Sequence, residues 1–219
     1  MKVLAEAREW YTELRVNKTM SALRKNGFEA LYVPTKEEAV SKILDLIPEK
    51  ALVGLGGSVT LREMGLPDAL RKRGNRVADH WEARARGASA EEELGTRRQH
   101  LNSDVFVTSS NAITETGELV NIDGGGQRVA AMIFGPRKVI VVAGINKIAE
   151  DADDGVKRAR NVAAPINARR LNRKTPCAVS GRCVDCDSAE RVCNITTVIH
   201  RRPRDTNLTV ILVGENLGY

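Results

Sequence analysis

Four cysteines fall close together late in the chain, and they are the residues with the clearest capacity for chemistry. Cys177, Cys183, Cys186 and Cys193 follow the spacing C-x5-C-x2-C-x6-C. The short step from Cys183 to Cys186 lets two thiolates reach one metal centre, and Gly181 supplies the backbone freedom that such a turn needs. We therefore interpret the four cysteines as ligands of a metal centre.

Three interpretations of these thiols compete. An iron–sulfur cluster of the 4Fe-4S type is favoured, because each thiolate can ligate a different iron and irregular spacing is accepted. Zinc is the alternative, although structural zinc sites usually use two closely spaced pairs and this chain has one. Two disulfides are disfavoured, because the sequence shows no secretory signal and the cytoplasm is reducing.

A glycine-rich stretch between an expected strand and an expected helix is the second feature with chemical potential. Its glycines are Gly54, Gly56 and Gly57, and Ser58 and Thr60 follow. Backbone N–H groups of such a turn bind anions, and the two hydroxyls add donors. The stretch matches neither the dinucleotide-binding pattern nor the P-loop pattern. It is thus either an anion-binding loop or simply a tight turn between strand and helix.

Two further polar stretches, 109–118 and 121–128, also follow expected strands. In open α/β sheets ligands gather at the carboxyl ends of strands. We therefore expect all three stretches to line one crevice that receives an anionic small molecule. The candidate ligand-binding residues of the two later stretches are Asn111, Glu115, Asp123, Gly124, Gly125 and Arg128.

The elements that must position these residues alternate between short apolar strands and helices. This alternation predicts an α/β domain with a mostly parallel sheet. A compositional break at about 165–193, where prolines, Gly181 and all four cysteines fall, predicts a cysteine-rich insertion within a single domain spanning 1–219. Strands are expected at 30–33, 51–54, 76–78, 104–107, 118–122, 139–142, 194–200 and 208–213, and helices at 1–27, from Thr35 to 47, 59–73, 90–101 and 149–163.

Composition restricts the classes of function. The chain has 219 residues and a net charge of +6, and no apolar run approaches the roughly 20 residues that span a bilayer. With no signal-peptide pattern, we expect a cytoplasmic protein without a membrane partner. Residues 157–174 carry seven basic side chains and no acidic ones. They form either a solvated helix face or a surface for a phosphate-bearing ligand, an acidic protein or nucleic acid. Nucleic acid is disfavoured, because no aromatic residue lies there to stack on bases.

Two long stretches of the sequence resemble a known family. GLGGSVTLREMGL at 54–66 and SSNAITETGELVNIDGGGQRVAAMIFGPRKVIVVAGINKI at 109–148 are similar to the LUD domain of bacterial lactate-utilisation proteins. The resemblance implies a Rossmann-like fold related to the CoA-transferase and ribose-5-phosphate isomerase superfamily, with helices flanking the sheet. It also implies a role in oxidising lactate or a related organic acid, alongside iron–sulfur or electron-transfer partner proteins. Many single-domain members lack the cysteine group, so this chain suggests a metal-bearing branch with its own substrate.

The favoured function is therefore organic-acid redox metabolism, as an enzyme or as an accessory subunit, and the sequence permits an oligomer. The alternative is a zinc-stabilised binding module that docks nucleic acid or an acidic partner through its basic stretch. Glu115 is a weak candidate nucleophile, because Glu115-Thr-Gly117 is superficially similar to the glutamate turn of CoA-transferases. His80 and Trp81 are interpreted as structural residues rather than as ligand contacts.

Overall fold

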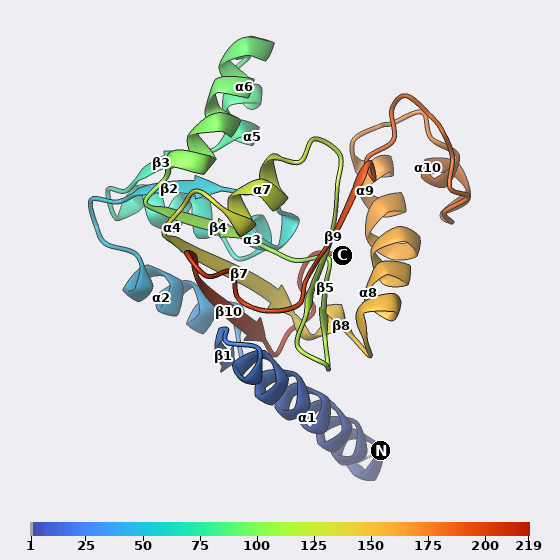
Figure 1. Cartoon of the computed structure of the whole chain (residues 1–219). Coiled ribbons are helices and arrows are strands. Elements are labelled where there is room, and N and C mark those ends of the chain that lie inside the picture. The colour runs from blue at the N-terminus through green and yellow to red at the C-terminus, as the bar shows by residue number, and fades with distance from the viewer. Residues whose placement is uncertain (1) are drawn as a thin grey trace.

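A six-stranded parallel sheet forms the centre of the molecule in the computed structural model, which describes residues 2–219 (Figure 1). Met1, the expected first residue of the opening helix, lies outside the described residues. The strand order is β1-β10-β7-β4-β2-β3, and every neighbouring pair is parallel. The strands are β1 (Glu29–Val33), β2 (Leu52–Leu55), β3 (Arg76–Ala78), β4 (Val105–Thr108), β7 (Lys138–Gly144) and β10 (Asn207–Val213).

The apolar character of the central strands explains their place in the sheet. In β7 and β10 nearly every residue is buried, which is typical of parallel strands covered on both faces. One face packs against α2 (Lys36–Leu46), α3 (Val59–Glu63) and α4 (Leu66–Lys72), whose apolar side chains include Ile43, Leu61 and Leu70. The other face packs against α1 (Lys2–Lys25), α7 (Gln127–Ile133) and a second sheet. The predicted α/β class with flanking helices is confirmed.

The second sheet has four strands in the order β8-β5-β6-β9. Its strands are β5 (Ala112–Thr114), β6 (Leu119–Asp123), β8 (Ile148–Ala149) and β9 (Ile195–Ile199). β6 pairs antiparallel with β5 and β9, while β5 and β8 are parallel. The strands expected at 118–122 and 194–200 therefore form, but outside the parallel sheet. β5 and β8 are new, because runs of two or three residues carry no periodicity.

Helices at the molecule's periphery complete the fold. α5 (His80–Ala85) and α6 (Ala90–Gln99) follow β3, and a 3-10 turn, His100–Asn102, leads into β4. In Figure 1 α6 projects at the top of the molecule. Among residues 2–219 no helix is long and apolar enough to cross a bilayer.

The helix expected at 149–163 ends later than predicted. α8 (Ala152–Arg158) continues through a π-helical turn, Ala159–Ala163, into α9 (Ala164–Arg170). Pro165 does not break the path, because it stands in the first turn of α9, where its missing N–H costs nothing. The irregular, cysteine-bearing segment accordingly begins near residue 171 rather than at 165. Its one element of regular secondary structure is the short helix α10 (Pro176–Ser180).

Candidate functional site

A polar crevice of about 410 Å³ opens at the carboxyl edge of the parallel sheet. The loops after β2, β4 and β6 and the 3-10 turn Ile145–Lys147 after β7 line it on the sheet side. Residues of α5, α6 and α9 and the segment 189–192 line it elsewhere. Helices α5 and α9 are far apart in the sequence, so the crevice is built from distant parts of the chain.

Lys147 is a buried cation at the crevice. Only 4% of its surface is exposed, and its Nζ donates to Thr60 Oγ1 (2.8 Å) and Ser109 Oγ (3.0 Å). Burial, and secondarily the nearby Arg158 and Arg128 guanidiniums, lowers the pKa of Lys147 from 10.5 to about 7. Lys147 is therefore partly neutral at physiological pH, which distinguishes it from ordinary surface lysines.

The crevice carries an excess of positive charge. Four of its basic side chains are ion-paired within the protein: Arg84 and Arg97 share Glu93, Arg128 pairs with Asp123 and Arg191 with Asp185. Across residues 2–219, no carboxylate lies within ion-pairing distance of the other three, Lys147, Arg170 and Arg173. Two acidic residues, Asp123 and Glu190, also line the crevice; its basic lining is Arg84, Arg97, Arg128, Lys147, Arg170, Arg173 and Arg191.

Trp81 forms one wall of the crevice together with Arg170 of α9. The Arg170 guanidinium carbon lies 4.5 Å from the centre of the Trp81 ring, and that of Arg62 lies 5.1 Å from it, both within cation–π range. Arg170 also donates to Tyr219 Oη (3.0 Å) and to Asn167 Oδ1 (2.7 Å). Trp81 thus joins α9 to α5 through contacts within the protein.

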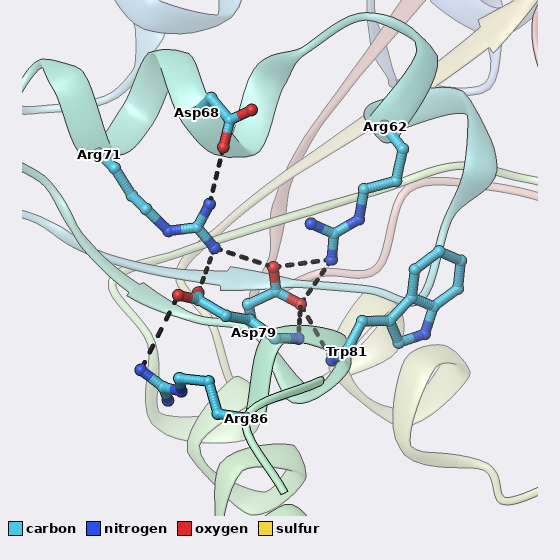
Figure 2. Close-up of polar contacts among 7 residues, drawn as sticks. Arg62, Asp68, Arg71, Asp79, Trp81 and Arg86 are labelled. Atoms are coloured by element: carbon cyan, nitrogen blue, oxygen red, sulfur yellow. Dashed lines mark hydrogen bonds and ion pairs between the residues drawn. The ribbon is translucent and has the colours of Figure 1, made fainter. Parts of the chain in front are cut away.

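Asp79 helps to fix the position of Trp81, because it caps the helix that begins beside Trp81 (Figure 2). It caps α5 by accepting from the Trp81 backbone N–H (3.0 Å), and its carboxylate accepts two hydrogen bonds from Arg62 Nη2 (2.6 and 2.7 Å). Arg71 bridges Asp79 and Glu82. Burial alone would raise the pKa of Asp79, but the hydrogen bonds and charge of Arg62 hold it below its usual value. This ionised carboxylate anchors both the helix and Arg62.

His80 and His100 are a buried pair beside the glycine loop, with ring centres 5.4 Å apart. Burial lowers the pKa of each to about 4; Arg97 adds to the effect at His80, and His80 adds to it at His100. Both rings are therefore neutral at physiological pH. His80 lines the crevice and is also buried against His100.

The glycine loop contributes to the crevice only through its last residues. Gly57, Ser58 and Thr60 line it. A Cβ on Gly57 would stand 2.8 Å from Trp81 Nε1, so this position requires glycine for close approach. Gly54 and Gly56 face away: a Cβ there would collide with Ser103 and Thr108, respectively. These two glycines serve packing, and they are not part of the crevice.

Two backbone N–H groups of the glycine triplet, Gly124 to Gly126, are already hydrogen-bonded within the protein. Asp123 Oδ1 accepts from the N–H groups of Gly125 (3.1 Å) and Gly126 (2.8 Å), so these amides are not free for an external anion. Gly124 and Gly125 nonetheless line the crevice.

The Arg128 side chain connects the polar loops through hydrogen bonds and an ion pair within the protein. Its Nε lies 3.2 Å from Asp123 Oδ2, and its terminal nitrogens donate to Ser109 O (3.2 Å), Asn111 Oδ1 (3.2 Å) and Ile122 O (2.6 Å). Asn111 Oδ1 in turn accepts from the Ile122 backbone N–H (2.8 Å). Asn111, Asp123 and Arg128 therefore reach the crevice as predicted, while most of their polar groups are engaged within the protein.

Glu115 lies outside the crevice lining. Its carboxylate pairs with Arg15 (2.6 Å) and Lys18 (3.0 Å) of α1. Burial would raise its pKa, but these two cations bring it below the usual value. A carboxylate paired with two cations is a poor nucleophile. Glu115 instead connects α1 to the second sheet through these ion pairs. The weak proposal of a CoA-transferase-type nucleophile receives no support from this position.

Comparison with known proteins decides the family. The LUD domain pattern matches residues 16–213. The chain belongs to the LUD domain family.

A solved structure of a DUF162 family protein from Deinococcus radiodurans, determined at 1.70 Å, has a similar fold. The two share 13% identity with a TM-score of 0.54, over 93% of this chain and 98% of that one. At this identity the likeness shows the fold alone. Among curated proteins, no relative matches the chain significantly.

The four cysteines of this LUD domain are half-buried and free of disulfides. Cys177 Sγ lies 3.3 Å from Thr175 Oγ1, and Cys183 Sγ accepts from the Asp185 N–H (3.4 Å). Across residues 2–219, no three Cys, His, Asp or Glu side chains are grouped so as to hold a metal ion. In this conformation the four thiols are therefore not gathered into a metal-binding group.

The basic stretch of the LUD domain is only partly a surface. Arg158 is half-buried and donates to the carbonyl oxygens of Asn111 (2.6 Å) and Asn146 (3.1 Å). Arg170 and Arg173 line the crevice. At least three of its seven cations thus serve the crevice or its support, which leaves fewer for an extended docking surface.

Lys147 is the residue that the sequence analysis missed. Its signal was present: a single lysine three residues after the buried central strand β7, followed by the apolar pair Ile148-Ala149. The crevice lining from α5, α6 and α9 was also missed, because helices far apart in sequence meet there only through the tertiary fold.

Proposed function

We propose that this LUD-domain protein binds a small anionic organic acid in the crevice and works in organic-acid redox metabolism of the lactate type. The observation that carries the proposal is Lys147, a cation 4% exposed whose partners are two hydroxyl groups instead of a carboxylate. Family membership supports the metabolic setting. The charge of the crevice supports the class of ligand.

The energetic argument follows from the cost of burying an unpaired charge. Removing an ammonium from water costs several kcal/mol unless an opposite charge compensates. At Lys147 the protein supplies hydroxyls only, so the lysine loses its proton near pH 7. A bound carboxylate would supply the missing charge and raise the pKa of Lys147. Binding of the acid should therefore be accompanied by proton uptake at Lys147.

The dimensions and lining of the crevice favour a small hydrophilic ligand. Its volume of about 410 Å³ lies near the lower end of the range, roughly 300–1,000 Å³, for small-molecule sites. Hydroxyls of Ser58 and Thr60 and the side chain of Asn167 line it beside the cations. Such a site suits a carboxylate that carries a further oxygen, as hydroxy and oxo acids do.

Isothermal titration calorimetry with lactate, pyruvate and inorganic phosphate tests this function. We expect one of the two organic acids to bind, and Lys147→Met to weaken it by tenfold or more, since about 1.4 kcal/mol corresponds to tenfold. Affinity should fall as pH rises through 7, because the ammonium form binds the carboxylate. Lys157→Met is the matched control, since Lys157 is an exposed lysine 3.7 Å from Asp154. Equal affinity in the wild type and Lys147→Met would contradict the proposal.

We propose separately that Cys177, Cys183, Cys186 and Cys193 bind an iron–sulfur cluster, with zinc as the alternative. Arg191 supports this second proposal, because it donates to the carbonyl oxygens of both Cys186 (2.7 Å) and Cys193 (3.4 Å) and so holds two of the four backbones near each other. The segment from 181 to 194 has no regular structure, so gathering the thiols requires no helix or strand to unfold.

Anaerobic purification with metal analysis tests the cysteine proposal. An iron–sulfur protein is brown with broad visible absorption, and a zinc protein is colourless. Cys183→Ser with Cys186→Ser should abolish the metal content, while Ser180→Ala in the same segment should not. A protein that contains neither iron nor zinc after purification from anaerobic, iron-replete cells would contradict both the iron–sulfur proposal and the zinc alternative. Binding to nucleic acid with steep salt dependence would instead favour the docking module.

A further inference from the structure

The side chain of Lys147 has one substituent position that the protein leaves open. Nζ donates one N–H to Thr60 Oγ1 and one to Ser109 Oγ. The Thr60 hydroxyl is itself directed at Leu217 O (3.4 Å) and the Ser109 hydroxyl at Ser110 O (3.3 Å). Both oxygens therefore act as acceptors toward the lysine, and the remaining position on Nζ has no partner within residues 2–219.

The chemical character of the open position on Nζ depends on the protonation state of Lys147. In the ammonium form it is a third N–H, which suits a carboxylate. In the neutral amine it is a lone pair, which is a nucleophile. Burial and the neighbouring cations bring the pKa of Lys147 to about 7, so both states are populated at physiological pH. Lysines in apolar or cationic surroundings are activated in this way for attack on carbonyl carbons.

We propose that Lys147 is a nucleophile that forms an iminium with the keto carbon of a 2-oxo acid held in the crevice. The inference rests on the proposed function and specifies its substrate class. The fixed N–H groups point the open position of Nζ toward the bound ligand, since Lys147 lines the crevice and its other two directions face protein. Arg170 and Arg173, which line the crevice without a carboxylate partner among residues 2–219, are available for the acid's carboxylate.

The step balances without an oxidant or a reductant. The Nζ lone pair forms a bond to the keto carbon, and the electrons of the carbonyl π bond move to its oxygen, which takes a proton. Nitrogen releases one proton, which gives the neutral carbinolamine. The carbinolamine oxygen then takes a second proton and leaves as water, while the nitrogen lone pair forms the C=N bond and nitrogen becomes positively charged. The net change is amine plus ketone plus one proton giving iminium plus water. A hydroxy acid has no carbonyl at this carbon and cannot take part.

The hydroxyl partners suit the proton movements of this step. Thr60 Oγ1 and Ser109 Oγ lie 2.8 and 3.0 Å from Nζ, close enough to exchange a proton with the amine or with the departing water. Both hydroxyls are buried, so bulk water does not compete directly for Nζ.

Borohydride trapping of the full-length protein tests the inference. The protein is incubated with pyruvate, reduced with sodium borohydride, digested and analysed by peptide mass spectrometry. We expect one stable carboxyethyl adduct per chain, on the peptide that contains Lys147. Lactate in place of pyruvate should give none. The rate of trapping should rise with pH through about 7 and then level off, opposite in direction to the pH dependence of carboxylate binding.

Variants and binding data separate the possible failures. Lys147→Met should lose the adduct, and Lys157→Met should retain it. Adducts spread over surface lysines, or absent while calorimetry shows pyruvate bound, would overturn the iminium and leave the proposed function standing. Absence of both the adduct and any organic-acid binding would overturn both. Peptide mapping of the wild type decides between these outcomes even if a variant folds poorly.

Discussion

The fold keeps a lysine at position 147 although this lowers its stability. In the unfolded chain the pKa of a lysine is about 10.4, whereas in the folded protein that of Lys147 is about 7. Between these two values the unfolded state binds more protons than the folded state. Linkage then requires the free energy of unfolding to rise with pH across that window. A side chain retained against stability is characteristic of binding and catalytic sites.

Replacing Lys147 by methionine should remove this pH dependence. The free energy of unfolding of the wild type should gain a few kcal/mol relative to Lys147→Met between pH 7 and 10, at about 1.36 kcal/mol per unit of pKa shift. Urea denaturation at several pH values measures it. Lys157→Met should follow the wild type. Parallel curves for the wild type and Lys147→Met would show that the lysine is not desolvated.

Asp79 and Asp68 provide a matched pair in one ion network (Figure 2). The side chain of Asp79 is 1% exposed and caps α5, whereas that of Asp68 is 89% exposed and pairs with Arg71. Asp79→Ala should cost about 2–3 kcal/mol through the lost cap and the lost charged hydrogen bonds. Asp68→Ala should cost less than about 0.5 kcal/mol. Chemical denaturation of both variants measures the difference, and equal losses would refute the anchoring role of Asp79.

At the scale of elements, the α8–α9 helix holds one wall of the crevice against the second sheet. Gly155 makes the close approach possible, since a Cβ there would stand 2.7 Å from Val120 Cγ2 on β6. The π-helical turn that follows shifts the register of α9, which carries Asn167 and Arg170 to the crevice. π-helical turns of this kind occur frequently at functional sites.

Gly155→Ala should therefore destabilise the protein even though alanine favours helices. Overpacking typically costs about 1–3 kcal/mol, which exceeds the gain in helix propensity of about 1 kcal/mol. Gly95→Ala in α6 is the control: its Cβ meets nothing within 4 Å, so only the gain remains. Thermal unfolding should give shifts of opposite sign. A stabilising Gly155→Ala would mean that α8 moves freely on the second sheet.

The sequence predicted where strands and helices lie better than it predicted which strands pair and how the helices continue. Long apolar runs were located, because burial on both faces leaves a continuous apolar pattern: β10 to within one residue, and β7 by its central four residues. The extension through Pro165 was missed, since a proline in the first turn of α9 reads as a break unless the preceding π-helical turn is known. β5, at three residues, is defined by its pairing with β6 and not by its own pattern.

At the scale of the whole molecule, the cysteine-bearing segment stands apart from the two main apolar cores. Neither core includes a residue between 169 and 198, and Figure 1 shows α10 and the following loop at the periphery beyond α9. The stability of the metal-free protein therefore resides in the two sheets and their helices.

Replacing all four cysteines by serine should accordingly leave the metal-free protein nearly as stable as the wild type, with a loss below about 1 kcal/mol. Leu70→Ala, in a core that covers the parallel sheet, should lose about 2–5 kcal/mol and serves as the positive control. Calorimetric unfolding in the presence of a chelator measures both. A large loss in the serine variant would place the segment within the cooperative core.

The location of the crevice could be anticipated in part. Ser58, Thr60, Asn111, Asp123 and Arg128 were predicted from strand ends, and they do meet. Which groups remain free there could not be predicted, because it depends on hydrogen bonds formed only after folding. Arg128 looked available and is internally engaged, whereas Lys147 is buried with two hydroxyl partners and no carboxylate in ion-pairing distance among residues 2–219.

A crystal structure of the protein with the tightest-binding organic acid tests the central claim most directly. We predict the ligand in the crevice, with a carboxylate or keto group at the open position of Lys147 Nζ, beside Thr60 and Ser109. An acid bound elsewhere, with Lys147 still contacting only its two hydroxyl partners, would contradict the claim that this buried lysine defines the site.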